Sequence, residues 1–194
     1  MSLTTDQRYT SVAVLLHWGI AACILFNLAT GFFMEGLKGE AKHVVVSLHA
    51  SSGLTVLALS LLRIVWRLSH RPPPLDAHLS RLERLLAEGV HGLLYVLMLA
   101  VPLAGWAISS ASTRKGAGAA LWLLMPLPKI GLLDALPLPQ KVAAHDSAVS
   151  AHQIGAWILL ALLAGHVAGA LKHQFIDRRP QFARMWFSGS SSKV

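Results

Sequence analysis

Four stretches of the sequence are each apolar enough and long enough to cross a lipid bilayer. They cover residues 12–33, 44–66, 90–109 and 149–171. A helix of about 20 apolar residues spans the hydrocarbon core and satisfies its own backbone hydrogen bonds where no water is present. Hydrophobic residues make up 54% of the 194 residues and charged residues 13%, which excludes an ordinary soluble domain. The sequence predicts an all-α integral membrane protein, a bundle of four transmembrane helices in a single domain.

Basic residues predict how this bundle is oriented. The segment between the second and third stretches and the C-terminal tail are rich in Lys and Arg, so the positive-inside rule places them, and both termini, in the cytoplasm. The other connections are then external, although they too carry more basic than acidic residues. The inner basic residues are Arg63, Arg67, Arg71, Arg81, Arg84, Lys172, Arg178, Arg179, Arg184 and Lys193. The outer charged residues are Lys38, Lys42, Arg114, Lys115, Lys129 and Lys141, with Glu35, Glu40, Asp134 and Asp146.

The net charge of +8 is expected to contact lipid headgroups. Nucleic acid is not a predicted partner, because no compact basic domain is present to bind it.

The connections contain three further predicted features. Pro72, Pro73 and Pro74 are expected to end the second helix, because proline removes a backbone donor. A short amphipathic helix is expected at 78–88, on the inner surface. The longest connection, 110–148, contains an apolar island at 119–127 that is too short to span and is expected to form an external cap. The Ser-rich tail, 188–194, is predicted to be disordered.

Four histidines lie within the apolar stretches at two matched depths. His152 and His166 are 14 residues apart, so both leave one helix face about 21 Å from each other along the axis. His17 and His166 each lie about five residues, or about 8 Å, from the inner end of their helices. His49 lies about five residues and His152 about three from the outer end. Such side chains are costly in a bilayer and are therefore candidates for function.

Two axial histidines per iron are what a low-spin, electron-transferring b-type haem requires, because six-coordination leaves no position open for oxygen. The depths therefore predict two haems, one between His17 and His166 and one between His49 and His152. The chain has one cysteine, Cys23, and no CxxCH motif, so both haems would be bound non-covalently. The alternatives are histidines that are merely packed or hydrogen-bonded, and a His-lined metal or proton transporter, which would be colourless.

Several other residues are candidates for contact with a haem. Arg63 and Arg67, one turn apart, are expected either to pair with haem propionates or to anchor the helix at the inner surface. Glycines in the spans would let a porphyrin face approach the backbone, or would simply pack helices together. These glycines are Gly19, Gly53, Gly105, Gly155 and Gly169.

The remaining histidines allow more than one interpretation. His91 opens the third stretch and could replace His17 as the partner of His166, but its shallower depth favours a hydrogen bond to a propionate or a quinone. His145 and His173 each lie two turns from a predicted ligand, and both are expected either to handle protons or to be surface residues. The other three are predicted to lie in solvated loops: His43, His70 and His78.

One ordered set of residues runs through all four stretches and the tail. It consists of His17–Trp18, His49 with Gly53, His91–Gly92–Leu93–Leu94–Tyr95, Pro102, Gly105, His152, Gly165–His166, Ala170–Leu171–Lys172–His173–Gln174–Phe175, Asp177 and Arg184–Met185. This set resembles the bacterial cytochrome b561 family over about residues 8–187. The resemblance implies a four-helix bundle in the bacterial inner membrane with two haems b, ligated by His17 with His166 and by His49 with His152. The chain departs from the family in 110–148, which is richer in Leu and Pro than expected.

That family includes superoxide oxidase, which takes electrons from superoxide at the periplasmic face and passes them through the haems to ubiquinone. The resemblance therefore implies superoxide as donor and ubiquinone as acceptor. Transfer would be outer-sphere and would need no catalytic acid or base. The surplus of external cations fits an anionic donor, because positive potential raises its encounter rate. The alternative is a cytochrome b relay or anchor subunit that passes electrons between a partner dehydrogenase or hydrogenase and the quinone pool.

Overall fold

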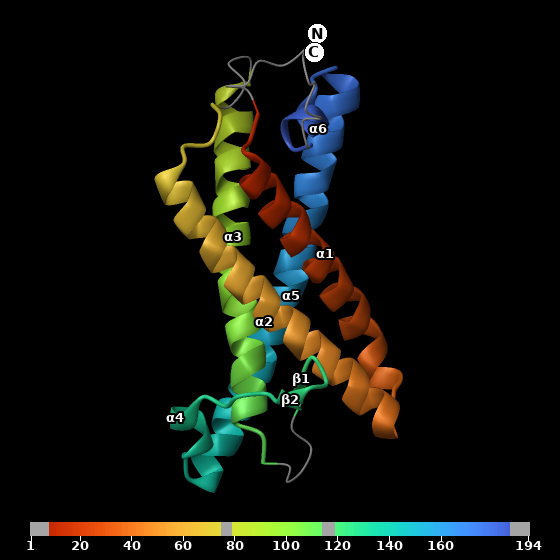
Figure 1. The fold of residues 1–194 in the computed structure, drawn as a ribbon, viewed down its shortest axis with the longest axis vertical. Helices are drawn as coiled ribbons and strands as arrows, with labels where there is room; N and C mark the ends of the chain where they lie inside the picture. Colours follow the sequence, from red (N-terminus) through yellow and green to blue (C-terminus); the bar gives the residue numbers. More distant parts are fainter. Residues whose placement is uncertain (1–7, 75–78, 114–118, 187–194) are drawn as a thin grey trace, which may run out of the picture.

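The computed structural model describes residues 8–74, 79–113 and 119–186, and four long helices account for most of them. These helices are α1 (Ser11–Phe33), α2 (Gly39–Ser69), α3 (Arg81–Ser110) and α5 (Leu138–Leu171). They run lengthwise through an elongated bundle (Figure 1). Each is long and apolar enough to cross a membrane, so the prediction of an all-α membrane bundle with four spans is confirmed.

The helices pack in chain order. α1 packs on α2, α2 on α3, and α3 on α5. Along the described helices, α1 and α5 approach each other through side chains rather than through close backbone packing. The two ends of the described chain meet at one end of the bundle, where the Tyr9 N–H donates to the Arg184 carbonyl. We call this the terminal end, and the opposite end, which carries β1, β2 and α4, the hairpin end (Figure 1).

The apolar core forms a layer in the middle of the bundle. Its buried members are Ile20, Ile24, Val56, Met98 and Leu159. They come from all four long helices, and Leu159 lies midway along the chain between His152 and His166. The core therefore separates the two ends of the bundle.

Short elements connect or extend the long helices. They are the 3₁₀ turn η2 (Met34–Gly36), the strands β1 (Ala120–Leu121) and β2 (Met125–Pro126), α4 (Gly131–Asp134), the π-helical turn η3 (Lys172–Ile176) and α6 (Gln181–Arg184).

The predicted amphipathic helix at 78–88 is wrong as a separate element. α3 begins at Arg81, and residues 81–88 form its first two turns; His78 lies outside the described residues. Ser80 starts the helix with a capping box, in which its side chain accepts from the Glu83 N–H and the Glu83 carboxylate accepts from the Ser80 N–H. Residues 81–88 contain neither Gly nor Pro, and the helix continues through them into the span. The predicted end of the second helix is confirmed, since α2 stops at Ser69, before the prolines.

The fourth helix is also longer than predicted. α5 starts at Leu138, eleven residues before the expected start at 149, so the predicted connection 110–148 is too long. The extra turns add about 16 Å and contain Lys141, His145 and Asp146. These polar residues lower the mean hydropathy of the segment, but they do not interrupt the helix.

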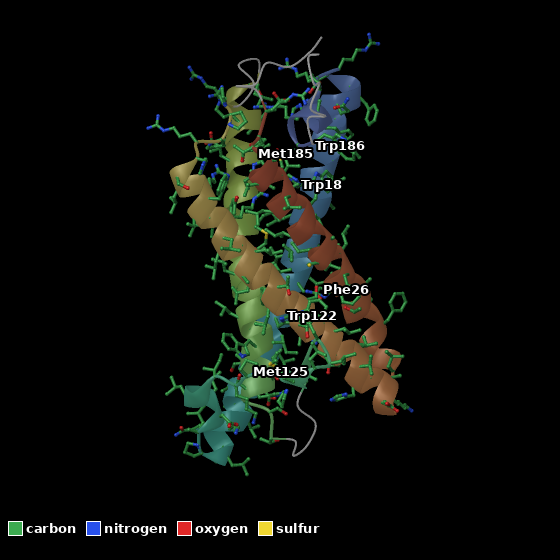
Figure 2. The ribbon with its side chains drawn as sticks, viewed as in Figure 1. Trp18, Phe26, Trp122, Met125, Met185 and Trp186 are labelled. Atoms are coloured by element: carbon green, nitrogen blue, oxygen red, sulfur yellow. The ribbon has the colours of Figure 1, made fainter. Side chains whose placement is uncertain are left out.

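The apolar island at 119–127 forms a hairpin that lies against the side of α2 near the hairpin end (Figures 1 and 2). Ser47 and Ser51 of α2 are fully buried beneath it. The Ala120 N–H donates to Ser47 Oγ at 3.0 Å, and the Trp122 N–H donates to Ser51 Oγ at 2.6 Å. The hairpin is therefore attached to α2 through its backbone.

We expect Ser51→Ala to lower the melting temperature of the detergent-purified protein. The change removes the acceptor of the part-buried Trp122 N–H, and a typical hydrogen bond contributes about 0.5–1.5 kcal/mol to stability. Ser69→Ala is the control, because Ser69 is exposed and bonds only with the end of its own helix. Equal melting temperatures for the two variants would contradict the role of Ser51.

Candidate functional site

The structure brings the four predicted histidines together as two pairs. The His17 and His166 rings, from α1 and α5, have centroids 6.2 Å apart. The His49 and His152 rings, from α2 and α5, have centroids 6.0 Å apart. All four side chains are half-buried. The first pair lies toward the terminal end and the second toward the hairpin end, on either side of the apolar core.

This spacing suits a metal ion shared by two imidazoles. Rings that bind one ion from opposite sides have centres about 6 Å apart, because each metal–nitrogen bond is about 2 Å long and the ring centre lies about 1 Å beyond the nitrogen. Both pairs match this distance. The residues present therefore fit the two axial positions of a haem iron at each level of the bundle.

Hydrogen bonds orient the hairpin-end pair. His152 Nδ1 lies 2.9 Å from the Val101 carbonyl, which can only accept, so this nitrogen carries the proton. His49 Nδ1 lies 3.0 Å from Thr30 Oγ1. The Thr30 hydroxyl donates to the Phe26 carbonyl, so its oxygen accepts from His49. In both rings Nε2 is thus left with a free lone pair, the form that binds metal.

Neighbouring residues fix the position of these two rings. A Cβ at Gly105 would lie 3.2 Å from His152 Cε1 and 3.3 Å from Nδ1, so Gly105 makes room for the imidazole. The Asn27 amide, with its nitrogen toward the His49 carbonyl, lies 3.1 Å from that oxygen and 3.1 Å from the Gly53 N–H. This amide joins α1 to the turn of α2 that carries His49.

The other predicted glycines have different surroundings. A Cβ at Gly155 would lie 2.7 Å from Val101 Cγ2, so Gly155 serves the packing of α5 on α3. Cβ atoms at Gly19 and Gly53 would make ordinary contacts with Leu59 and Asn27, and one at Gly169 would meet nothing within 4 Å. Gly155 therefore supports the helix-packing interpretation, whereas close approach of a porphyrin face to a glycine stays a prediction.

The surroundings of the terminal-end pair include a third histidine. His91 has its ring centroid 5.2 Å from that of His166. The prediction that His91 opens its helix at shallow depth is wrong, because α3 begins ten residues earlier and the ring reaches the pair. The distance is nevertheless shorter than two imidazoles across one metal ion require.

Of the two predicted arginines, Arg63 is bonded to α1 and α3, one helical turn from His17 and from His91. Its Nε donates to the Tyr95 hydroxyl at 3.0 Å and its Nη1 to the Ala13 carbonyl at 3.0 Å. Arg67 lies exposed on α2, with its guanidinium 5.7 Å from the centre of the Tyr95 ring.

Aromatic residues cover the terminal-end pair. The Trp18 ring contacts His17 edge to face at 5.3 Å and Trp186 at 6.3 Å. Trp18 Nε1 donates to the Met185 carbonyl at 2.8 Å, so the C-terminal segment lies against α1 (Figure 2). Sequence reasoning did not find this contact, although Trp18 and Met185 belong to the recognised set of motifs.

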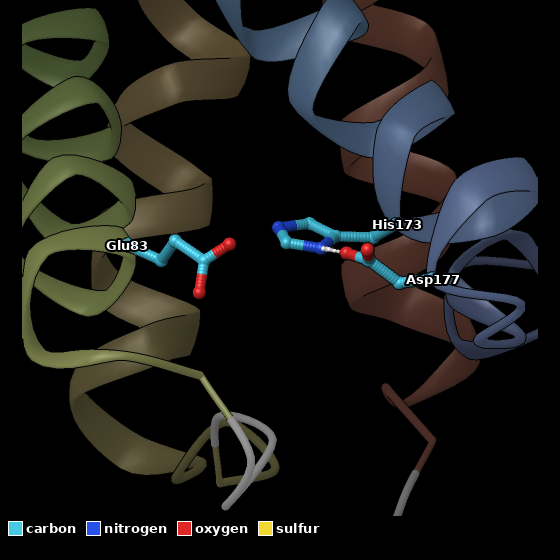
Figure 3. A group of neighbouring side chains, drawn as sticks. All are labelled: Glu83, His173 and Asp177. Carbon is cyan, nitrogen blue, oxygen red and sulfur yellow. Dashed lines mark hydrogen bonds and ion pairs between the residues drawn. The ribbon is translucent and has the colours of Figure 1, made fainter.

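His173 belongs to an ion-pair cluster at the terminal end (Figure 3). His173 Nδ1 lies 2.6 Å from Asp177, and Lys172 Nζ lies 2.8 Å from Glu83 and 3.0 Å from Asp177. Lys172, and then His173, hold the pKa of Asp177 below its usual value. Ligand atoms of Glu83, His173 and Asp177 are close enough to hold a metal ion. The Lys172 ammonium already pairs with both carboxylates, so the cluster links α3 to the end of α5 without one.

The remaining histidines lie away from the two pairs. His145 pairs with Asp146 at 3.0 Å on the extension of α5. The prediction of a loop is wrong for His43, which lies exposed in the first turns of α2. His70 ends the same helix, with its ring stacked on Trp66 at 3.7 Å.

Comparisons with known proteins agree over nearly the whole chain. Residues 8–188 match the model of the family described as prokaryotic cytochrome b561. Cytochrome b561 homolog 2 of Escherichia coli (strain K12) is 31% identical, over 98% of each chain. Cytochrome b562 of Cereibacter sphaeroides is 31% identical, over 94% of this chain and 98% of its own. Probable superoxide oxidase CybB of Yersinia pestis is 23% identical, over 92% of this chain and 96% of its own.

Membership of this family implies b-type haem and electron transfer in a membrane. The four spanning helices and the histidine pairs have the chemistry that this requires. The chain therefore belongs to the prokaryotic cytochrome b561 family of membrane electron-transfer proteins.

Proposed function

We propose that the chain holds two haems b and carries electrons from superoxide at the hairpin end to ubiquinone. His17 and His166 would ligate the terminal-end haem, and His49 and His152 the hairpin-end haem. The observation that carries this proposal is the ring spacing of 6.2 and 6.0 Å in two pairs on opposite sides of the core. A bis-histidine haem b supplies one-electron chemistry, changing between ferric and ferrous iron without binding oxygen.

The neighbouring residues support these roles. The Val101 carbonyl and Thr30 fix the rings of the hairpin-end pair with Nε2 free. His91 lies too close to His166 to share an iron with it, which favours the role of hydrogen-bonding a propionate or a quinone. Arg63 is bonded to the helices that carry His17 and His91, whereas the exposed Arg67 fits surface anchoring.

The proposed orientation places the terminal end in the cytoplasm of a bacterial cell and the hairpin end in the periplasm. The end of α2, the start of α3 and the end of α5 all lie at the terminal end (Figure 1). Arginines concentrated in these segments satisfy the positive-inside rule. They include Arg71, Arg81, Arg84, Arg178 and Arg179.

Superoxide is proposed as the donor because one relative bears the name probable superoxide oxidase. Two superoxide anions would lose one electron each and leave as oxygen, and ubiquinone would take two electrons and two protons to become ubiquinol.

At the hairpin end, Lys129 and Lys141 share Asp134 at 2.7 and 2.8 Å. These two cations hold the pKa of Asp134 at about 2, so one positive charge of the three groups is uncompensated at neutral pH. Such a charge attracts an anion.

The test uses the detergent-purified chain alone. We expect two haems b per chain in the reduced-minus-oxidised spectrum, reduction by superoxide, and ubiquinol formation at a rate that falls as salt is added. Salt should act because it screens attraction between charges. Two haems that superoxide leaves oxidised would favour a relay that needs a partner dehydrogenase or hydrogenase. A protein without haem would overturn the proposal.

Replacing single ligands should remove single haems. We expect His152→Ala to lose the hairpin-end haem and His166→Ala the terminal-end haem, each halving the haem content measured by pyridine haemochrome. His70→Ala should keep both haems, since His70 stacks on Trp66 away from the pairs. Two haems retained in either ligand variant would refute the assignment.

Gly105→Ala should selectively weaken the hairpin-end haem. The added methyl group would crowd the His152 ring, with contacts of 3.2 and 3.3 Å, and displace Nδ1 from the Val101 carbonyl. We expect partial loss of one haem on detergent purification, measured as haem per chain. The matched control is Gly89→Ala on the same helix, where a Cβ meets nothing within 4 Å. Full haem content in both variants would show that the ring tolerates the methyl group.

A further inference from the structure

We propose that Arg63 raises the midpoint potential of the terminal-end haem above that of the hairpin-end haem, and so sets the direction of electron flow through the bundle. The inference rests on the proposed function, because it assumes the two haems assigned above.

Arg63 is a charged side chain held inside the spanning part of α2. Guanidinium does not lose its proton in proteins, so the charge is permanent. The side chain is half-buried and tied at both sides, by Nε to the Tyr95 hydroxyl of α3 and by Nη1 to the Ala13 carbonyl of α1, each at 3.0 Å. Two hydrogen bonds from one guanidinium to two neighbouring helices hold this charge between α1, α2 and α3.

The two anchors of Arg63 lie beside the terminal-end pair. Ala13 lies one helical turn before His17, and Tyr95 one turn after His91. The two hydrogen bonds thus hold the Arg63 guanidinium one helical turn from His17 on α1 and from His91 on α3. A haem iron loses one positive charge when it is reduced, so a nearby fixed cation favours the reduced state at this level of the bundle.

The hydrogen-bond partners of the hairpin-end pair have the opposite effect. They are neutral groups, the Thr30 hydroxyl and the Val101 carbonyl. A carbonyl that accepts from His152 Nδ1–H makes the imidazole a stronger electron donor, which favours ferric iron. Arg63 would raise the midpoint potential of the terminal-end haem, and the Val101 carbonyl would lower that of the hairpin-end haem. Both effects therefore increase the difference between the two potentials.

An electron delivered at the hairpin end would then move toward Arg63. One iron loses the electron that the other gains, so no bond forms or breaks and no proton is needed. This direction agrees with oxidation of superoxide at the hairpin end and reduction of a quinone at the other.

The test is a potentiometric titration of purified Arg63→Gln, followed by visible spectroscopy. We expect the midpoint of the terminal-end haem to fall, the other midpoint to stay, and two haems to remain bound. Arg63→Lys should keep most of the difference, because the charge is retained. Arg67→Gln is the matched comparison and should shift the terminal-end midpoint less than Arg63→Gln, since Arg67 is exposed one turn further along α2 and water screens its charge.

Each midpoint can be assigned by repeating Arg63→Gln in the His152→Ala background, which retains only the terminal-end haem. Unchanged midpoints in Arg63→Gln, or equal shifts of both, would overturn the inference. If Arg63→Gln does not fold, Tyr95→Phe loosens the guanidinium by removing one anchor. A smaller fall in the same midpoint supports the inference, and no fall contradicts it.

The outcomes for the inference and the proposed function are distinguishable. If the wild-type protein does not contain two haems, the proposed function is wrong. If it contains two haems that superoxide reduces, but Arg63→Gln leaves both midpoints unchanged, only the inference is wrong.

Discussion

The contact between α3 and α5 at Val101 is the interaction on which the hairpin-end site depends. The side chain of Val101 packs against Gly155, and its carbonyl accepts from His152. A larger residue at 155 would push α5 away from α3, and the histidine would lose its acceptor. On its other side α5 meets α1 and α2 through side chains, which include the imidazole pairs and Phe32 against Trp157, rather than through close backbone packing. Helix assembly and cofactor binding are therefore coupled, because a metal ion between two rings would also join the helices that carry them.

Regular geometry explains why the spans and pairs could be predicted from the sequence. A bilayer requires about 20 apolar residues per helix, and a spacing of 14 residues returns a side chain to the same face. Helix ends could not be predicted in this way. Hydropathy indicates which residues can lie in lipid, but a helix can extend beyond them into polar residues. The starts of α3 at Arg81 and α5 at Leu138 are set by capping and by the absence of breakers in polar turns. The late prediction for α3 is also why His91 was expected at the wrong depth.

The residues that orient the histidines could not be found from the sequence. Thr30 and the Val101 carbonyl contact the histidines because α1 and α3 are rotated so that these groups face them. The spacing of apolar residues along the sequence does not define that rotation. Gly105 was expected to admit a porphyrin face or a neighbouring helix, and its contact with His152 supplies a different physical reason for a glycine there. Asn27 lies in an apolar stretch of α1, and its amide joins α1 to α2 beside His49.

The electrostatic difference between the two ends does not depend on which donor the protein uses. Arg63, Tyr95 and Ala13 lie within the bundle, whereas a donor or partner protein would meet only the surfaces at its ends. Superoxide oxidation and a relay between partner proteins therefore require different residues in the loops at the ends of the bundle. Both require the same electron transfer through its interior. In both functions the electron must move in one direction. A permanent cation near one of two similar sites favours movement toward that site. Selection on the donor could thus change the hairpin end while leaving the α1–α2–α3 contacts around Arg63 intact.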